Sequence, residues 1–135
     1  MTARDLKMAE AAALLGISPD TVRRRATAAG LEPGGSPGHQ TLPAEAVARL
    51  ATQEAADSHL DDLGDLAPAS ARNRLRGVVT RVVRDGVMAQ VDVQAGPYRV
   101  VSLISREAAD ELGLEPGSLV AATVKATNVG IEGIR

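Results

Sequence analysis

The spacing of apolar residues changes once along this chain, from a helical period to a period of two. Before residue 53 apolar side chains recur three and four positions apart, as in the stretch Met8–Leu15, which is typical of amphipathic helices. After residue 69 they alternate with polar side chains, as in Val87–Val93, which is typical of strands with one buried face. Helices first and strands second predict an α+β protein of two domains.

Acidic charge gathers in the segment between these two patterns. Residues 53–69 hold five acidic and no basic residues, whereas residues 1–52 hold six basic and five acidic ones, and residues 70–135 nine basic and seven acidic ones. We therefore expect domains at 1–52 and 70–135, joined by an acidic linker. This linker is either a solvated tether or an interaction segment that holds the basic N-terminal face.

Composition limits how each domain builds a core. Apolar residues make up 44% of the 135 residues, yet among Phe, Trp and Tyr only Tyr98 occurs, so Val, Leu, Ile and Ala must fill both cores. Two domains this small are marginally stable alone, and we expect oligomerisation to bury further surface. The absence of Cys excludes disulfides and thiolate metal sites. Because no signal peptide or long apolar run is present, we expect a soluble, cytoplasmic protein without a membrane partner.

Capping residues divide the N-terminal stretch into helices. Gly16 is suited to end a helix over Met8–Leu15, since glycine favours the left-handed backbone past a C-cap. Ser18 suits an N-cap and Pro19 the first helical position, so a second helix should follow. A third helix opens at Pro43. The short turn between the first two helices is typical of a helix-turn-helix motif.

The second helix carries the residues that point to DNA. Val22 and Ala26 form its buried face. We expect Arg24 and Arg25 on the opposite face, with Arg23 beside them, where guanidinium groups reach phosphates or guanine edges. The stretch Gly34–His39 is unsuited to a helix or a regular strand, and we expect a wing there that lies along a groove. The candidate DNA-binding residues are Thr21, Arg23, Arg24, Arg25 and His39.

Residues 6–50 resemble the winged helix-turn-helix domains of excisionases and MerR-like regulators. The resemblance implies a mostly α-helical domain that contacts DNA through its second helix and its wing. The alternative is a helical protein-interaction module with a solvated arginine face. In one departure from the pattern, Arg24 and Arg25 replace aromatic residues often found there. The matching stretches are Leu6–Ala12, Leu14–Ser18, Thr21–Arg24 and Leu42–Ala46.

Turn signals divide the C-terminal stretch into short strands. Asp85-Gly86 and Gly96-Pro97 are suited to tight turns between strands, and Ser105–Leu112, closed by Gly113, is typical of a short helix. Five strands with one helix after the third predict a small OB-like, five-stranded β-barrel. The expected strands are Val78–Val83, Val87–Val93, Tyr98–Ile104, Leu119–Ala126 and Val129–Ile134.

Hydrogen-bond donors gather at the ends of these elements. Ser70 and Arg72 precede the first strand, Ser105 begins the short helix, and Lys125 ends a late strand. Lysine is scarce, since Lys7 and Lys125 stand against 13 arginines, and a compact ammonium group fits a small cage better than a broad guanidinium does. Hydroxyl, guanidinium, ammonium and free N–H groups are the donors that a tetrahedral oxyanion needs around it. The pattern indicates an oxyanion site.

Residues 70–134 resemble the Mop (molbindin) domain, a TOBE-like domain of molybdate-storage proteins, molybdate-responsive regulators and transporter ATPases. The resemblance implies a molybdate or tungstate oxyanion bound by Ser70, Arg72 and Lys125, with Ser105 completing the site across a subunit interface. It also implies assembly as dimers, often as hexamers. The matching stretches are Ser70–Asn73 with Gly77, Ile104–Glu107, Glu111–Leu114 with Pro116-Gly117, and Val124–Thr127 with Val129.

Ala108 departs from this family pattern, which commonly has a serine whose hydroxyl faces the ligand. The missing donor is worth roughly 1.5–3 kcal/mol toward a charged acceptor, while the backbone N–H of Ala108 stays available. The candidates also have plain structural interpretations. Ser70 and Ser105 are then local caps, Arg72 an interface salt bridge, Lys125 a solvated strand end, and Asn73 a turn hydrogen-bonder.

The two resemblances together predict a molybdate- or tungstate-responsive transcriptional regulator that binds DNA. The alternatives are a molybdate storage or homeostasis oligomer whose helical domain serves attachment, and a constitutive DNA-binding protein that its barrel merely oligomerises. A pterin would require stacking surfaces beyond Tyr98, so the free oxyanion is favoured as the ligand. We expect no enzyme, because Cys is absent, His39 and His59 fall in the wing and the linker, and no acid–base pair is placed at a barrel end.

Overall fold

The computed structural model describes residues 4–134 and divides into two compact units. The N-terminal unit ends at His59, and the C-terminal unit begins at Leu60. Within the described residues, none of the helices has the length and apolar character needed to cross a membrane.

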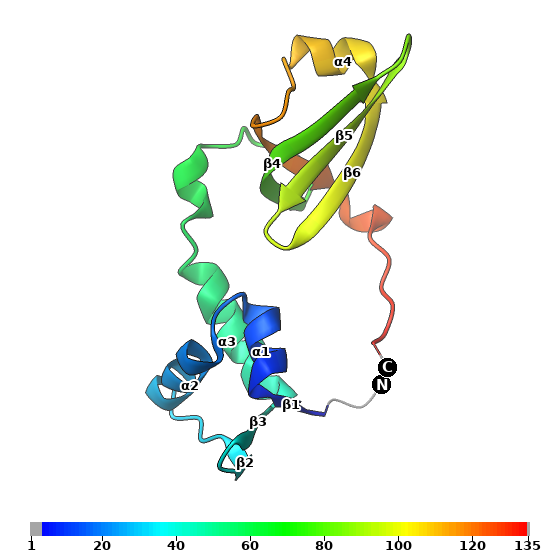
Figure 1. The fold of residues 1–135 in the computed structure, drawn as a ribbon. Coiled ribbons are helices and arrows are strands. Elements are labelled where there is room, and N and C mark those ends of the chain that lie inside the picture. The colour runs from blue at the N-terminus through cyan, green and yellow to red at the C-terminus, as the bar shows by residue number, and fades with distance from the viewer. Residues whose placement is uncertain (1–3, 135) are drawn as a thin grey trace. The chain divides into compact units, whose positions relative to one another are not determined.

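The N-terminal unit combines helices with a small antiparallel sheet (Figure 1). In this sheet β3 lies in the middle, with Lys7 of β1 opposite Thr41 and Ser36 of β2 opposite His39. The elements are β1 (Asp5–Lys7), α1 (Met8–Leu15), α2 (Pro19–Ala28), β2 (Gly34–Ser36), β3 (His39–Pro43) and α3 (Ala44–Ala56).

The capping residues place the helices as the sequence predicts. Gly16 has a φ of 68° and ends α1 in the left-handed conformation. The Ser18 hydroxyl accepts the N–H of Thr21 at 3.1 Å, and Pro19 opens α2. The third helix is longer than expected, because α3 continues to Ala56 and occupies the start of the stretch interpreted as a linker. The unit boundary accordingly falls after His59.

The hairpin of residues 34–43 corrects one expectation. The stretch Gly34–His39 was expected to be irregular, but Gly34–Ser36 forms β2 and pairs with β3. A strand of three residues needs few backbone partners, and β3 supplies them. Gly35 has a φ of 80°, and a Cβ there would collide with the carbonyl oxygen of His39, so only glycine permits this approach.

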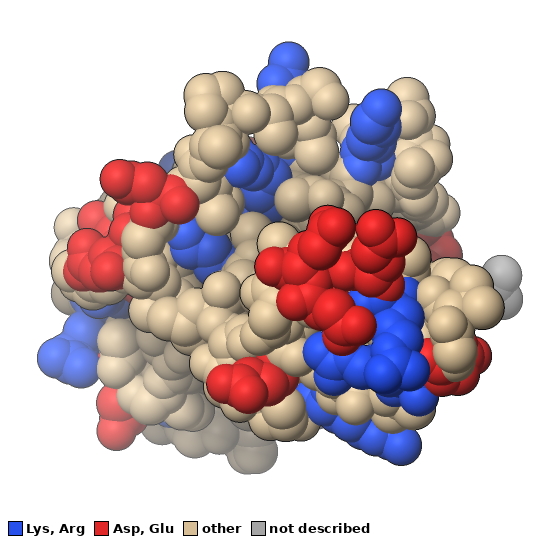
Figure 2. All heavy atoms as spheres, turned by 90° about the horizontal axis from the view of Figure 1, so that it is seen from above, with Lys and Arg blue, Asp and Glu red and all other residues tan. Residues whose placement is uncertain are grey.

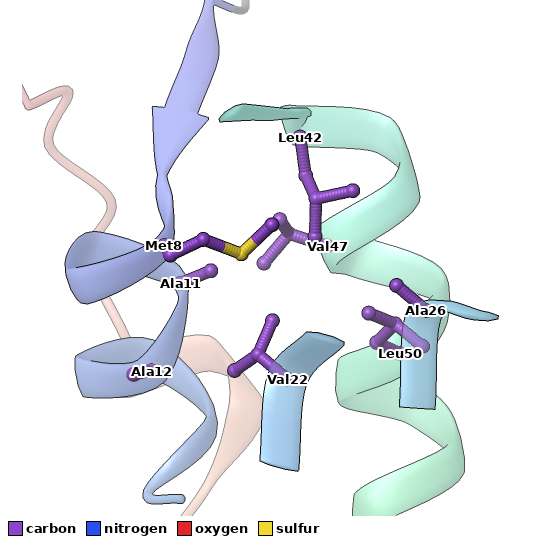
Figure 3. Packing of buried hydrophobic residues seen from close by; sticks show 8 residues of the cluster. All are labelled: Met8, Ala11, Ala12, Val22, Ala26, Leu42, Val47 and Leu50. Carbon is purple, nitrogen blue, oxygen red and sulfur yellow. The ribbon is translucent and has the colours of Figure 1, made fainter. Parts of the chain in front are cut away.

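Apolar side chains from the three helices and β3 enclose one core (Figure 3). Val22 and Ala26 point from α2 into it, as their spacing predicts, and both are fully buried. The buried members are Met8, Ala11, Ala12, Val22, Ala26, Leu42, Val47 and Leu50.

The C-terminal unit is built on a four-stranded antiparallel sheet in the order β6-β5-β4-β7. The longest strand, β4, pairs with β7 along its first half and with β5 along its second half. An irregularity between Val79 and Arg81 interrupts the pairing with β5, and such bulges bend and twist a strand. The elements are η1 (Leu60–Leu63), β4 (Asn73–Arg84), β5 (Met88–Ala95), β6 (Tyr98–Ser105), α4 (Arg106–Glu111), β7 (Leu119–Val124) and η2 (Ala126–Asn128).

The fifth predicted strand is absent from the described chain. Residues 129–134 form neither a helix nor a strand, and Ile131 and Ile134 are 93% and 85% exposed. Alternating residues predict which face a strand would bury, but a strand also needs a neighbour to accept its backbone hydrogen bonds. In the described chain this segment pairs with neither edge strand of the sheet. The sheet is therefore a curled half-barrel with open edges at β6 and β7, rather than a closed five-stranded barrel.

The concave face of this sheet is filled by valines and by residues near α4. Val79, Val91 and Val93 are buried there together with Ala109 of α4 and Leu114. This cluster contains no aromatic side chain, as the composition requires.

Candidate functional site

Two cations lie together at one end of the sheet. Arg72 directly precedes β4 and Lys125 directly follows β7, and the register sets Asn73 opposite Val124. The side-chain amide of Asn73 donates to the carbonyl oxygen of Val124 at 3.1 Å and so ties the two strand ends together. Arg72 and Lys125 are both exposed. This end of the sheet therefore presents two solvent-facing positive charges from adjacent strands.

Asn73 acts differently from its sequence interpretation. The sequence predicts a hydrogen bond within a turn. The side-chain amide of Asn73 instead bonds Val124 of another strand, 51 positions further along the chain. Ser70 lies just before this point and is exposed. Three of the predicted oxyanion ligands, Ser70, Arg72 and Lys125, are thus close to one end of the β4–β7 pair.

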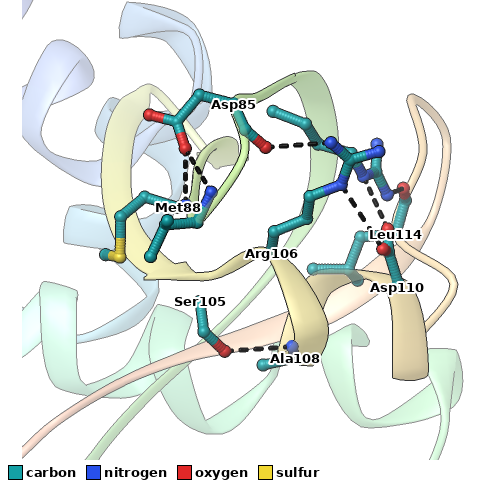
Figure 4. Close-up of polar contacts among 9 residues, drawn as sticks. Asp85, Met88, Ser105, Arg106, Ala108, Asp110 and Leu114 are labelled. Atoms are coloured by element: carbon teal, nitrogen blue, oxygen red, sulfur yellow. Dashed lines mark hydrogen bonds and ion pairs between the residues drawn. The ribbon is translucent and has the colours of Figure 1, made fainter.

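Ser105 occupies the junction of β6 and α4. Its hydroxyl oxygen accepts the N–H of Ala108 at 3.0 Å and caps the helix (Figure 4). The backbone N–H of Ala108, predicted to face the ligand, is engaged by this cap. The Ser105 oxygen acts as an acceptor here, so its own hydroxyl hydrogen is still available as a donor. Within one chain, Ser105 therefore acts as a helix cap.

The surroundings of Ser105 are rich in paired charges. Arg84 donates through Nε to Asp110 at 2.8 Å, and Arg106 reaches the carbonyl oxygen of Asp85 at 2.9 Å and the Asp110 carboxylate at 3.6 Å. Figure 2, which views the molecule from the α4 end of Figure 1, shows acidic side chains gathered directly against basic ones. The arginines beside Ser105 are therefore already engaged by carboxylate and carbonyl oxygens.

The register of β4 separates Ser105 from the two cations. Ser105 pairs with Met88 of β5, and the next residue of β5 pairs with Arg84, the last residue of β4. Lys125, in contrast, directly follows the residue that pairs with Asn73, the first residue of β4. Twelve residues of β4 lie between those ends, and a strand of that length measures roughly 35 Å before curvature. An oxyanion a few ångströms across cannot touch both ends within one chain.

The acidic segment is attached to the sheet by arginines of β4. Arg76 bonds the Asp61 carboxylate and the Gly64 carbonyl oxygen, each at 2.9 Å. Arg74 donates to the Ala67 carbonyl oxygen at 2.5 Å. The sequence predicts either a solvated tether or an interaction segment that holds the basic N-terminal face. Asp61 of this segment pairs with the C-terminal unit. The two arginines are two positions apart in β4, a spacing that places them on one face of the strand.

The arginines of α2 have different environments. Arg24 is exposed, and its guanidinium lies 3.1 Å from the Thr21 hydroxyl, which also bonds Ser18 within the helix cap. Arg23 bonds Asp20 at 2.5 Å and Gln40 at 2.9 Å. Arg23 therefore connects α2 to the hairpin of residues 34–43.

Arg25 points toward α3 instead of outward. Its guanidinium lies 3.2 Å from Glu54 and 3.9 Å from Asp57. It follows Val22 by three positions, which places it beside the buried face of the helix rather than opposite it. The expectation that Arg25 shares the outer face with Arg24 is therefore wrong. His39 is exposed at the start of β3.

Comparisons with known proteins concern the C-terminal unit. The sequence model of the TOBE domain family matches residues 69–131. Molybdenum-pterin-binding protein 2 of Clostridium pasteurianum is 40% identical over 63 residues, which are 46% of this chain and 93% of that protein. The chain belongs to the TOBE domain family. Molybdenum-pterin-binding protein 1 of the same organism is 36% identical over the same share of each chain.

Solved structures add two further similarities to this TOBE unit. A molybdate-binding protein from Sporomusa ovata is 31% identical, covers 50% of this chain and all of its own, and has a TM-score of 0.48. MopII from Clostridium pasteurianum is 37% identical, with 49% and 100% coverage and a TM-score of 0.46.

The candidate oxyanion residues all fall inside the TOBE match, which spans residues 69–131. The helices of the N-terminal unit and their arginines fall outside it. The comparisons therefore bear on the oxyanion candidates, which are Ser70, Arg72, Ser105, Ala108 and Lys125.

Proposed function

We propose that the TOBE unit binds a tetrahedral oxyanion, molybdate or tungstate, through donors from two copies of the chain. Arg72, Lys125 and Ser70 of one copy supply the charge and one hydroxyl, and Ser105 of the second copy supplies another. The observation that carries this proposal is the position of exposed Arg72 and Lys125, which directly flank the paired ends of β4 and β7. The names of the relatives, molybdenum-pterin-binding and molybdate-binding proteins, support the choice of ligand.

The distance between the donors is the reason for requiring a second copy. Ser105 lies beyond the far end of β4, among arginines that already bond Asp85 and Asp110. A dianion at Ser105 alone would meet carboxylates without a free guanidinium. When a second copy brings its Arg72 and Lys125 to this helix cap, the ligand gains both charge and hydroxyl donors.

The open half-barrel supports self-association as a dimer or hexamer. Its concave side holds a groove of about 350 Å³, lined by apolar residues such as Val93, Val100 and Leu114. The segment after η2 exposes Ile131 and Ile134. Covering the groove or the exposed isoleucines with a second copy removes apolar surface from water and so stabilises the assembly.

The free oxyanion is the proposed ligand rather than a pterin. A flat pterin ring needs aromatic faces on which to stack, and Tyr98 is the only Phe, Trp or Tyr of the sequence. The donors of Ser70, Arg72 and Lys125 suit an ion that consists of acceptor oxygens. Molybdate and tungstate share charge and shape, and both are proposed ligands.

The N-terminal unit is proposed to bind DNA, which makes the whole chain an oxyanion-responsive transcriptional regulator and not an enzyme. Arg24 and the exposed residues 34–39 of the hairpin are the supporting features, since arginines on one helix face and a neighbouring hairpin fit adjacent grooves of a duplex. The oxyanion can change the affinity for DNA by no more than the difference between its own affinities for two arrangements of the subunits.

Calorimetric titration tests the oxyanion site. Wild-type protein should bind molybdate and tungstate more tightly than sulfate, and Lys125→Ala should lower molybdate affinity tenfold to a hundredfold, about 1.5–3 kcal/mol. Arg81→Ala removes another exposed arginine of β4, away from the site, and should leave the affinity unchanged. Equal affinities for Lys125→Ala and wild type would remove the basis of the proposed site.

DNA binding at fixed salt, with and without saturating molybdate, tests the regulator. The proposal expects two different binding curves. Coinciding curves reject the sensor and leave the storage or homeostasis oligomer, which requires several oxyanions per subunit in the calorimetric stoichiometry.

A further inference from the structure

A cavity of about 410 Å³ lies between the start of α2 and the hairpin of residues 34–43. Three elements line it: Lys7 and Met8 at the β1–α1 junction, Pro19 and Arg23 of α2, and Gly38–Thr41 of the hairpin. The charged residues that line the cavity are basic: they are Lys7 and Arg23, and no Asp or Glu is among the described lining residues. A cavity of this kind favours an anionic occupant.

Arg23 is held in place at the cavity wall. Its Nε donates to the Gln40 side chain at 2.9 Å, and its Nη1 bonds Asp20 at 2.5 Å. These contacts fix the guanidinium between α2 and β3. The Asp20 carboxylate, 89% exposed on the solvent side, offsets part of the Arg23 charge. A second cation is therefore needed for strong attraction, and Lys7 is placed to supply it.

Lys7 enters the cavity from the strand that precedes α1. It pairs in register with Thr41, another lining residue. Its backbone N–H bonds Glu10 at 2.9 Å, which stabilises the start of α1 without using the side-chain ammonium. Glu10 is itself paired with Arg4 at 2.7 Å, and the charge of Lys7 makes only the smallest of the contributions that lower the pKa of Glu10. Substitution of the Lys7 side chain should therefore leave the helix cap intact.

The position of this cavity matches a feature of duplex DNA. When one element enters the major groove and a hairpin lies in the adjacent minor groove, the sugar–phosphate backbone between the grooves passes between those two elements. Here the space between α2 and the hairpin is the cavity with Lys7, Arg23 and His39. We propose that it holds a backbone phosphate of DNA, with Lys7 as the principal counter-charge. This proposal rests on the DNA-binding function proposed above.

Salt titration of binding to a DNA duplex by the full chain tests the proposal. Each lost phosphate contact lowers the slope of log K against log salt by about 0.9. Lys7→Ala should lower affinity several-fold and reduce the slope by about that amount, whereas Lys7→Arg should restore most of both. Arg49→Ala is the matched control, since it removes one exposed cation of α3 outside the cavity and should change the slope much less.

The outcomes separate the two proposals. If wild-type protein binds no duplex at any salt concentration, DNA binding itself is rejected. If it binds and Lys7→Ala, with unchanged Tm, keeps the wild-type slope and affinity, the phosphate site is rejected while DNA binding stands.

Inorganic phosphate distinguishes the source of the phosphate group. Titrated at constant ionic strength, it should shift the NMR signals of Lys7 and His39 only weakly, and a duplex should shift them strongly. If free phosphate saturates the cavity and a duplex does not displace it, the cavity binds a small ligand and the proposal of a DNA backbone phosphate is overturned.

Discussion

The two units of this protein complete their cores in different ways. The N-terminal unit surrounds Val22, Leu42 and Leu50 on all sides with three helices and β3, so that each is at most 1% exposed. The C-terminal sheet leaves two edges open and exposes Ile131 and Ile134. Helices satisfy their backbone hydrogen bonds internally and here close most of the N-terminal core, whereas the C-terminal core rests on a sheet whose edge strands leave backbone groups without a partner strand. The proposed oxyanion site lies in the unit that is left incomplete.

The largest expected effect comes from the enclosed core. Leu50→Ala should lower the stability of the N-terminal unit by about 2–5 kcal/mol, because it leaves a cavity where Leu50 is 1% exposed. Thermal denaturation of the full chain measures this loss. Leu14→Ala is the control, since Leu14 is 63% exposed. If the substitution also abolishes molybdate binding, the two units do not fold independently.

The second effect concerns the open sheet. Ile131→Asp should barely change the stability of a single chain, because the side chain is already in solvent. It should shift the assembly toward monomers and lower molybdate affinity at least tenfold, since a buried charge opposes association. Sedimentation analysis and calorimetry measure the two results. Leu14→Asp should leave the oligomer intact, and an unaffected Ile131→Asp assembly would mean that another surface joins the copies.

A smaller effect is expected where the two strand ends meet. Asn73→Ala removes the hydrogen bond to the Val124 carbonyl oxygen, which should cost about 1 kcal/mol of stability. Because that bond sets the spacing of Arg72 and Lys125, molybdate affinity should fall several-fold as well. Asn128→Ala, outside this strand pair, serves as the control. A loss of stability with full affinity would limit Asn73 to a structural role.

The smallest effects depend on pH and have the same direction in both units. The guanidinium of Arg4 lowers the pKa of Glu10 to about 2 from its ordinary 4.5. The contribution of Glu10 to stability is therefore complete above pH 4.5 and is lost as the pH falls toward 2. Backbone N–H groups of Met88 and Val87 lower the pKa of Asp85 in the same direction.

Substitution of either carboxylate makes these contributions measurable. The difference in Tm between wild type and Glu10→Gln should be largest near neutral pH and should shrink between pH 4.5 and 2. Asp85→Asn should show the same trend as the pH falls below the ordinary Asp pKa of 3.8. Differences in Tm that do not depend on pH would show that the charge of these groups is not what stabilises the start of α1 and the β4–β5 turn.

Sequence patterns predicted the local structure well because the signals are local. Gly16 and Ser18 set the turn between α1 and α2 through their own backbone preferences. Asp85 and Gly86 mark the β4–β5 turn, where the Asp85 carboxylate accepts the N–H groups of Val87 and Met88. The oxyanion candidates came from the family resemblance, and their chemical role stays a prediction.

The sequence by itself determined the two-part organisation, the caps and the buried face of α2, because each depends on neighbours a few positions away. Only the tertiary structure decided that Arg25 meets α3, that Arg76 holds Asp61, and that four strands pair while a fifth does not. It also decided that Ser105 and Lys125 lie at opposite ends of β4. Those outcomes depend on which distant segments come together. Hydrophobic periodicity predicts which face of an element is buried, but it does not identify the segment that covers that face.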